Sequence, residues 1–179
     1  TFIGLASAQA AIKGEEVEYK AGNTLHKGYL VYDDAVTGKR PGVLVVHEWW
    51  GHHEHARNSA RKLAEAGYVA LALDMYGDGR RADHPDQAGK FAGEVGKNLP
   101  LMKSRFGAGM KLLRKQAQVD GKRVAAIGYC FGGSVVLRIR EVSGDRLELV
   151  SLRERHAESE RALEGLRAAN AQLQEQART

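Results

Sequence analysis

The sequence lacks the features that would build a disulfide framework, a membrane span or a nucleic-acid-binding surface. Its 179 residues contain one cysteine, so no disulfide can form within the chain. No apolar run approaches the roughly 20 residues that a transmembrane helix needs. The net charge is +5, but the basic residues are scattered and no basic cluster is interleaved with aromatic residues. We therefore expect one ordinary globular domain, without a membrane span or a nucleic-acid partner.

The single cysteine lies in a segment that predicts a nucleophile. Residues 128–133 read GYCFGG and directly follow the apolar run 124–127, which predicts a buried strand. A strand that leads into a small-residue turn with one nucleophile at its tip is the nucleophile-elbow pattern, with Cys130 in the serine position. A helix after the turn would stabilise a thiolate through its N-terminal amides and dipole. The alternative is that Cys130 is a small buried residue that fills a gap at a strand end.

The N-terminal residues, 1–10, resemble the end of a signal peptide. An apolar stretch at 2–6 precedes Ala-Gln-Ala at 8–10, which has the form of a signal-peptidase site. Cleavage after Ala10 would give a mature chain that begins at Ala11. We therefore expect export to the periplasm or the medium of a bacterium, and the alternative is an apolar N-terminal tail that is not cleaved.

Apolar strands alternate with helical segments through the middle of the chain. A Gly-Asn turn at 22–23 predicts a hairpin, and continuous apolar runs predict strands buried on both faces. The predicted strands are 15–20, 25–32, 42–47, 69–74 and 124–127, and the predicted helices are 54–66, 86–97 and 101–118. This alternation predicts an α/β fold with a mostly parallel sheet and flanking helices. The chemistry of such sheets gathers beyond the carboxyl ends of the strands.

Three candidate side chains follow predicted strand ends, namely Glu48, Asp74 and Cys130. A glutamate that closes a buried strand needs a polar partner, and an elbow thiol on a neighbouring strand could be that partner. The alternative for Glu48 is a carboxylate in contact with water. For Asp74 we expect hydrogen bonds to the following loop rather than a chemical role.

Three ordered motifs resemble those of the dienelactone hydrolase family of α/β-hydrolases. They are GYCFGG at 128–133, VVHEWWG at 45–51 and ALDMYG at 72–77, and the resemblance covers about residues 11–134. It implies a partial α/β-hydrolase fold. It also implies cleavage of a small-molecule lactone or carboxylic ester, as in carboxymethylenebutenolidases, which use a Cys-His-Asp triad.

The resemblance also implies roles for individual residues. Cys130 would be the nucleophile, and Glu48 would interact with the resting thiol and help to generate the thiolate. The backbone N–H groups of Phe131 and Trp49 would form the oxyanion hole. Apart from the resemblance, we expect Trp49 and Trp50 to line an apolar substrate pocket or to pack against the sheet.

The residues that would select the substrate are less well matched. In archetypal family members, an arginine that helps to bind the substrate carboxylate closely follows the Asp-x-Tyr segment. Here Gly77 and Asp78 stand in that place, with Arg80 and Arg81 nearby. We expect Arg80 and Arg81 to border the pocket, and the preferred substrate stays open.

Histidines are dense in the segment 47–55, which reads HEWWGHHEH. The metalloprotease pattern H-E-x-x-H places two histidines on one helix face. Here the spacing is one residue longer, and the segment spans a strand end and a glycine loop. We expect a solvated loop that leads into a helix, with no metal and no cofactor. Zinc binding by His52, His53 and His55 is the alternative.

The composition changes after residue 137. No lysine follows Lys122, glycine becomes rare, and a set of positions at alternating spacings of three and four is apolar except at His156, Ser159 and Asn170. The positions with this spacing are 149, 152, 156, 159, 163, 166, 170, 173 and 177. Such a heptad pattern predicts a coiled-coil tail and a homodimer. The alternatives are a lone amphipathic helix or a tail produced by a shifted reading frame.

The predicted organisation is a signal-peptide remnant at 1–10, the N-terminal part of a dienelactone hydrolase-like domain at 11–137 and a helical tail at 138–179. The family strands that carry the triad Asp and His have no counterpart in the tail. The one histidine after the elbow, His156, lies on the predicted tail helix. We therefore expect a hydrolase that is impaired by loss of these groups. The alternative is a non-catalytic oligomerising or binding protein.

Overall fold

The computed structural model describes residues 11–143. The predicted signal-peptide remnant and most of the predicted tail, including His156, lie outside the described residues. The strands are β1 (Ile12–Ala21), β2 (Thr24–Asp33), β3 (Arg40–Val46), β4 (Val69–Leu73) and β5 (Val119–Gly128). The helices are α1 (Glu54–Glu65), α2 (Pro85–Gly96), α3 (Leu99–Arg114) and α4 (Phe131–Ser143). Each strand and helix predicted between residues 15 and 127 is present, with ends that shift by a few residues.

The strands form one five-stranded sheet in the order β1-β2-β4-β3-β5. Strands β4, β3 and β5 are parallel to one another, as the buried apolar runs predicted, and β5 is the edge strand at that side of the described sheet. The hairpin β1–β2 joins this parallel core through antiparallel pairing of β2 with β4. The α/β prediction is therefore confirmed, but the sheet is mixed rather than mostly parallel. The hairpin was predicted, but its place at the edge of the sheet does not follow from alternation alone.

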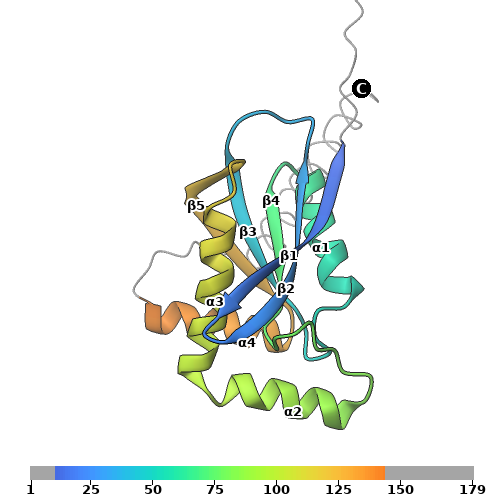
Figure 1. Ribbon diagram of the computed structural model, residues 1–179, viewed down its shortest axis with the longest axis vertical. Helices are drawn as coiled ribbons and strands as arrows, with labels where there is room; N and C mark the ends of the chain where they lie inside the picture. The colour runs from blue at the N-terminus through green and yellow to red at the C-terminus, as the bar shows by residue number, and fades with distance from the viewer. Residues whose placement is uncertain (1–10, 144–179) are drawn as a thin grey trace, which may run out of the picture. The chain divides into compact units, whose positions relative to one another are not determined.

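Helices cover both faces of the sheet (Figure 1). Helix α1 packs on one face, where Ala56, Ala60 and Ala64 meet the strand residues Val31 and Val45 in a small apolar cluster. Helices α3 and α4 cover the other face. The larger cluster there includes Leu44, Leu71, Leu73, Phe106, Leu113, Val135 and Val136. Fully buried parallel strands between two helical layers explain why their sequences are apolar without alternation.

The C-terminal end of α1 is set by a glycine and by hydrogen bonds to the last carbonyls of the helix. Glycine at position 67 has φ +89°, a left-handed conformation that favours glycine. The N–H of Gly67 donates to the carbonyl of Ala64, and the N–H of Tyr68 donates to that of Leu63. These bonds satisfy carbonyls that the helix leaves unpaired, so the predicted stop at Gly67 is confirmed.

Helix α4 continues past the change in composition at residue 137 and runs to Ser143. Val135, Val136 and Ile139 are buried against the sheet, and Leu137 is exposed. The first residues of the predicted tail, 138–143, are therefore the last turns of the elbow helix. Among the described helices, none is both long enough and apolar enough to cross a membrane.

Candidate active site

The turn between β5 and α4 has the geometry of a nucleophile elbow. Cys130 has φ +53°, a left-handed conformation that costs a residue other than glycine about 1–2 kcal/mol. Helix α4 begins at the next residue, so the Phe131 N–H lies in a first turn in which the helix supplies no acceptor. Cys130 is exposed to solvent. A gap-filling role for Cys130 is therefore wrong, because the thiol is presented to solvent at a strained turn.

Glycines permit this turn because two backbone segments approach closely. A Cβ added at Gly128 would overlap the backbone of Gly132 and come within 2.7 Å of the Gly133 nitrogen. A Cβ added at Gly132 would overlap the carbonyl of Val46 and come within 2.7 Å of the carbonyl oxygen of His47. The elbow therefore packs directly on the end of β3.

Strand register brings Glu48 and Cys130 to the same edge of the sheet. In the parallel pairing of β3 with β5, Val46 lies opposite Gly128. Glu48 and Cys130 each follow these partners by two residues. The carboxylate of Glu48 is partly exposed and lines a pocket of about 300 Å³ with Trp50 and Ala82. The carboxyl ends of β3 and β5 therefore lie side by side, as predicted. Glu48 is in contact with solvent rather than fully buried.

Two rings connect Glu48 with the elbow. The Nδ1 atom of His55 lies 3.7 Å from Oε2 of Glu48. The same imidazole meets the ring of Tyr129, the residue before Cys130, with 4.9 Å between ring centroids. His55 is exposed and lines the pocket, as does His53. The His55 imidazole therefore lies between the Glu48 carboxylate and the ring of Tyr129.

The loop after β3 is held by hydrogen bonds to the carbonyls of Glu48, Trp49 and Trp50. The Gly51 N–H donates to the Glu48 carbonyl (3.2 Å), and the Ala82 N–H donates to the Trp50 carbonyl (2.9 Å). The hydroxyl of Tyr76 donates to the Trp49 carbonyl (2.8 Å). These bonds fix the peptide planes around Trp49, whose N–H is the second predicted oxyanion donor. The side chains of Trp49 and Trp50 pack edge to face, with centroids 5.1 Å apart.

His47 is buried and supports the loop after β3 through hydrogen bonds of its ring. The Met75 N–H donates to Nε2 of His47 (3.1 Å). Nδ1 therefore carries the proton and donates to the Glu48 carbonyl (2.5 Å). Complete burial lowers the pKa of His47 to about 4, so the imidazole stays neutral. With both nitrogens engaged, His47 is a structural support rather than a proton carrier.

Tyr76 contacts the loop after β3, the ring of His47 and the elbow residue Phe131. Its ring contacts His47 (centroids 4.7 Å apart) and Phe131 (5.6 Å). Burial raises the pKa of Tyr76, and the charge of Cys130 raises it further. The phenol therefore stays protonated and keeps its donor role toward Trp49. His47 and Tyr76 lie inside the motifs at 45–51 and 72–77, but no local pattern in the sequence predicts that they support the loop.

Asp74 organises the loop after β4, as predicted. Its Oδ1 accepts from the N–H groups of Tyr76 (3.0 Å) and Gly77 (2.8 Å). Its Oδ2 accepts from those of Lys27 (3.1 Å) and Gly79 (2.9 Å). The side chain is fully buried. The prediction that Asp74 bonds the loop is confirmed.

The two arginines near the loop differ. The guanidinium of Arg80 donates to the Tyr76 carbonyl, lies 3.2 Å from a Glu94 oxygen and stacks over Phe91 at 4.7 Å. These contacts engage Arg80 in the loop–α2 interface. Arg81 is exposed and pairs through its backbone with Gly51, at the pocket edge. Their roles toward substrate stay predictions.

A metal centre is not formed by the residues that the structure describes. Within 11–143, no three or more His, Cys, Asp or Glu side chains are grouped so as to hold a metal ion. Burial, with a contribution from the Arg57 charge, lowers the pKa of His52 to about 3. His53 is the N-cap of α1, so the segment leads into a helix as predicted, but it is not solvated throughout, because His47, Gly51 and His52 are buried.

Comparison with known proteins supports the resemblance to the dienelactone hydrolase family. The model of the dienelactone hydrolase family matches residues 26–148. "Protein usf" of Aquifex pyrophilus is 33% identical over 128 residues, covering 68% of this chain and 53% of that protein. A protein of Aquifex aeolicus (strain VF5) named "Putative carboxymethylenebutenolidase" is 33% identical, covering 69% of this chain and 54% of that one. The chain thus spans about half the length of these relatives.

Solved structures give the same result. The structure titled "m3DLH" has a TM-score of 0.73 and 39% identity, covering 76% of this chain and 57% of that chain. A dienelactone hydrolase-like promiscuous phosphotriesterase, P91, from metagenomic libraries has a TM-score of 0.68 and 37% identity, covering 73% of this chain and 54% of that chain. On the family match, the elbow and the shared fold, this chain belongs to the dienelactone hydrolase family.

Proposed function

We propose that this chain cleaves a lactone or carboxylic ester through a thiolate at Cys130, and that its turnover is slow because no Asp–His pair is formed beside Cys130 by residues 11–143. The observation that carries the proposal is the strained elbow, with Cys130 at φ +53° directly before α4. The helix N-terminus favours negative charge at the sulfur. Family membership supports the same reaction class.

Glu48 is the group that we propose to accept the thiol proton. It leaves β3 in register with the elbow and lines the pocket. The sulfur then attacks the substrate carbonyl, and the oxyanion forms beside the N–H groups of Phe131 and Trp49. Collapse of this intermediate breaks the bond to the leaving oxygen and leaves a thioester on Cys130. Water must hydrolyse the thioester to complete turnover.

We expect hydrolysis of the thioester, the second step, to be the slow one. Hydrolysis of a thioester needs a base that activates water. Among the described residues, His47 has both nitrogens engaged, and His52 is buried with a low pKa. Of the pocket histidines, His53 is the N-cap of α1 and His55 lies in its first turn, so both belong to the segment that carries Glu48 rather than to a later loop of their own. Acylation should therefore outrun deacylation.

The test is a burst experiment with p-nitrophenyl acetate and the full chain. We expect release of about one equivalent of p-nitrophenolate, followed by a much slower steady rate. Cys130→Ala should abolish the burst, and Glu48→Gln should slow it while leaving its amplitude near one equivalent. Mass spectrometry should find the acetyl group on Cys130.

Two results would contradict different parts of the proposal. A burst that persists in Cys130→Ala would show that Cys130 is not the nucleophile. Rapid steady turnover that disappears in Cys130→Ala would keep the nucleophile and refute the proposed impairment. Export of the chain and dimer formation through the tail stay predictions, because both concern residues outside those described.

A further inference from the structure

A long stretch of the chain around α3 carries positive charge without carboxylates. Residues 95–119 contain no aspartate or glutamate. The basic residues in the stretch are Lys97, Lys103, Arg105, Lys111, Arg114 and Lys115. Arg105 is buried and pairs with Glu94 at 3.2 Å. The other five are exposed, and no carboxylate of residues 11–143 lies within ion-pair distance of them.

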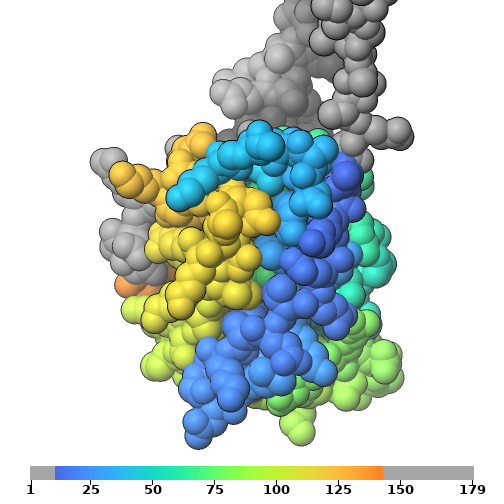
Figure 2. Space-filling model, turned by 45° about the horizontal axis from the view of Figure 1, so that its top comes forward, coloured from blue at the N-terminus to red at the C-terminus, as the bar shows by residue number. Residues whose placement is uncertain are grey.

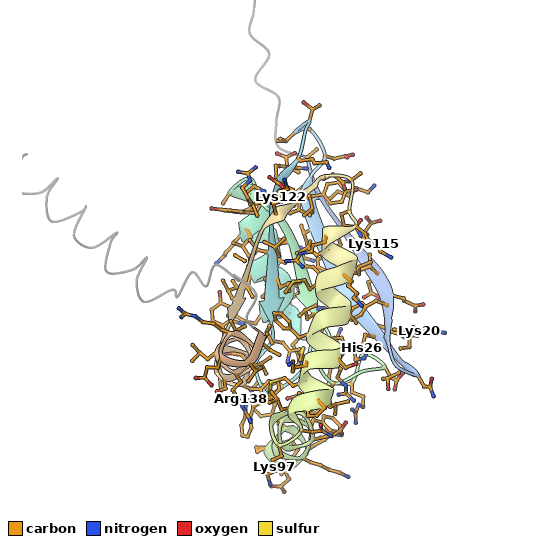
Figure 3. The ribbon with its side chains drawn as sticks, turned by 90° about the vertical axis from the view of Figure 1, so that its left-hand side faces the viewer. Lys20, His26, Lys97, Lys115, Lys122 and Arg138 are labelled. Carbon is orange, nitrogen blue, oxygen red and sulfur yellow. The ribbon has the colours of Figure 1, made fainter. Side chains whose placement is uncertain are left out.

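Part of this basic stretch lines a groove between α3 and the β1–β2 hairpin. The groove has a volume of about 500 Å³. One wall is Tyr19, Lys20, Ala21 and Gly22, and the other is Lys103, Ser104, Gly107, Ala108, Lys111, Leu112 and Lys115. Figure 2 shows the blue hairpin beside the yellow surface of α3. In Figure 3, Lys115 lies near the C-terminal end of α3, and Lys97 lies near its other end.

The strand wall of the groove belongs to an edge strand. Among the described residues, β1 pairs with β2 alone, so its other edge presents unpaired main-chain N–H and C=O groups. The last residues of β1 form this wall. Tyr19 is buried, with its hydroxyl bonded to Asp74. Alternation along the strand places Glu18 on the face opposite Tyr19, so this carboxylate points away from the α3 side.

We propose that the groove binds an extended acidic peptide segment of a partner protein. The segment would add a strand to the free edge of β1, and its carboxylates would lie beside Lys111, Lys115 and Lys103, whose ammonium also donates to the Val142 carbonyl (3.5 Å). Residues 104–115 of the α3 wall span about 17 Å at 1.5 Å per residue. An extended chain covers that length with about five residues. Small residues at 107 and 108 let the peptide approach the helix backbone.

The groove suits a peptide better than a membrane or a single-stranded nucleic acid. The exposed large apolar residues among those described are Val36, Leu137 and Val142, and none of them lines the groove. Insertion into a bilayer surface requires such residues. Stacking of bases requires exposed aromatic rings, and the one aromatic residue of the lining, Tyr19, is buried. The site does not involve Cys130, so it is independent of the proposed hydrolysis.

The experiment uses the full chain and a fluorescein-labelled decapeptide of alternating glutamate and threonine. Fluorescence anisotropy at low salt should show binding that weakens in 0.5 M NaCl, because the interaction is between charges. The double variant K103E/K111E should lose about tenfold or more in affinity. The matched variant K62E/K90E changes the net charge equally, at exposed positions on α1 and α2, and should bind nearly as tightly as the unmodified chain.

Two further peptides separate charge from strand pairing. A glutamine–threonine decapeptide should not bind, and a glutamate peptide with N-methyl groups on alternate amides should bind much more weakly. Amide shifts caused by the peptide should concentrate at residues 19–22 and 104–115. Circular dichroism of each variant checks the fold, and Lys-to-Gln versions of the same positions serve where a reversal unfolds the chain.

Several outcomes would overturn the proposal. Equal loss of affinity in the two double variants would show that net charge alone matters. Binding of a ten-nucleotide thymidine strand, or of phosphatidylglycerol vesicles, as tight as that of the peptide would identify a general polyanion surface. Self-association that K103E/K111E removes would make a second copy of the chain the occupant. Absence of peptide binding at millimolar concentration would refute the site directly.

Discussion

Asp74 shows how one buried carboxylate can organise the approach to an active site. Each of its two oxygens accepts two backbone N–H groups. One of the four donors is in β2 and the other three are in the loop after β4. That loop carries Tyr76, whose hydroxyl holds the Trp49 carbonyl. A charged acceptor with four donors stabilises the loop more than neutral bonds would. The position of a predicted oxyanion donor therefore depends on a carboxylate for which we expect a structural role.

Replacing Asp74 with asparagine should destabilise the fold by about 2–4 kcal/mol. The amide keeps one acceptor oxygen and turns an NH₂ group toward two backbone donors, which are then buried without partners. The measurement is the free energy of unfolding from urea titration. Asp78→Asn is the matched control, because Asp78 is exposed and asparagine tolerates its φ of +56°. A similar stability for the two variants would contradict this account.

At the scale of an element, the strand–turn–helix unit from β5 to α4 depends on one contact with β3. The Cβ that alanine would add at Gly132 overlaps the Val46 carbonyl, which belongs to a fully buried strand. The backbone of that strand is held on both sides by β4 and β5, so it cannot move away. The elbow and the end of β3 are therefore positioned together.

Gly132→Ala should cost about 1–3 kcal/mol of stability, the usual effect of overpacking a core. It should also change the rate at which iodoacetamide alkylates Cys130, because the turn must shift. Gly133→Ala is the control within the same elbow, since its added Cβ meets nothing closer than the Gly128 oxygen at 3.3 Å. We expect that variant to stay within about 1 kcal/mol of the unmodified chain. Equal effects of the two substitutions would show that the close approach to β3 is not the cause.

The unit from β5 to α4 could be predicted from sequence because its pattern is local. An apolar strand, glycines at fixed offsets and one cysteine define the turn without reference to other elements. The alternation of strands and helices predicted the α/β class for the same reason. The role of Asp74 also followed from its place directly after a strand.

Other features depend on contacts between distant segments, and no local pattern carries them. Pairing of β2 with β4 depends on long-range register, so the sheet was expected to be mostly parallel although it is mixed. The support that His47 gives to Glu48 needs the N–H of Met75, which lies 28 residues away. Arg80 was expected at the pocket, and its guanidinium contacts Glu94 and Phe91 of α2. These partners become neighbours only when the loop after β4 folds over the sheet.

At the scale of the whole molecule, three histidines are buried in neutral form. Burial lowers the pKa of His47 to about 4 and that of His52 to about 3, and it also lowers the pKa of His26. His26 is fully buried between β2 and the loop after β4, where its ring stacks on Tyr19 and bonds the Asp74 carbonyl (2.8 Å). All three lie near the carboxyl ends of the strands. Protonation of any of them works against the folded state.

The sign of the pH dependence follows from these shifts. Each histidine has a folded pKa below its unfolded value of about 6.5, so the unfolded chain binds more protons below that pH. The stability that the neutral forms contribute is fully present above pH 6.5 and is lost as the pH falls toward 4. His47 and His52 should each contribute a slope of up to about 1.4 kcal/mol per pH unit in this window. Glu16, Glu94 and Asp120 have lowered pKa values, so their contribution is lost only at more acidic pH.

Urea unfolding at pH 7.5, 6.5, 5.5 and 5.0 should therefore show a constant stability at first and then a steep loss. His52→Gln should reduce the slope below pH 6.5 by about one histidine's share, whatever it does to stability at pH 7.5. The matched control is His84→Gln, because the His84 side chain is 72% exposed and its replacement should leave the slope unchanged. A flat profile between pH 7.5 and 5.0 would contradict the argument. It would mean that water reaches these imidazoles and lets them titrate in the folded chain as they do in the unfolded one.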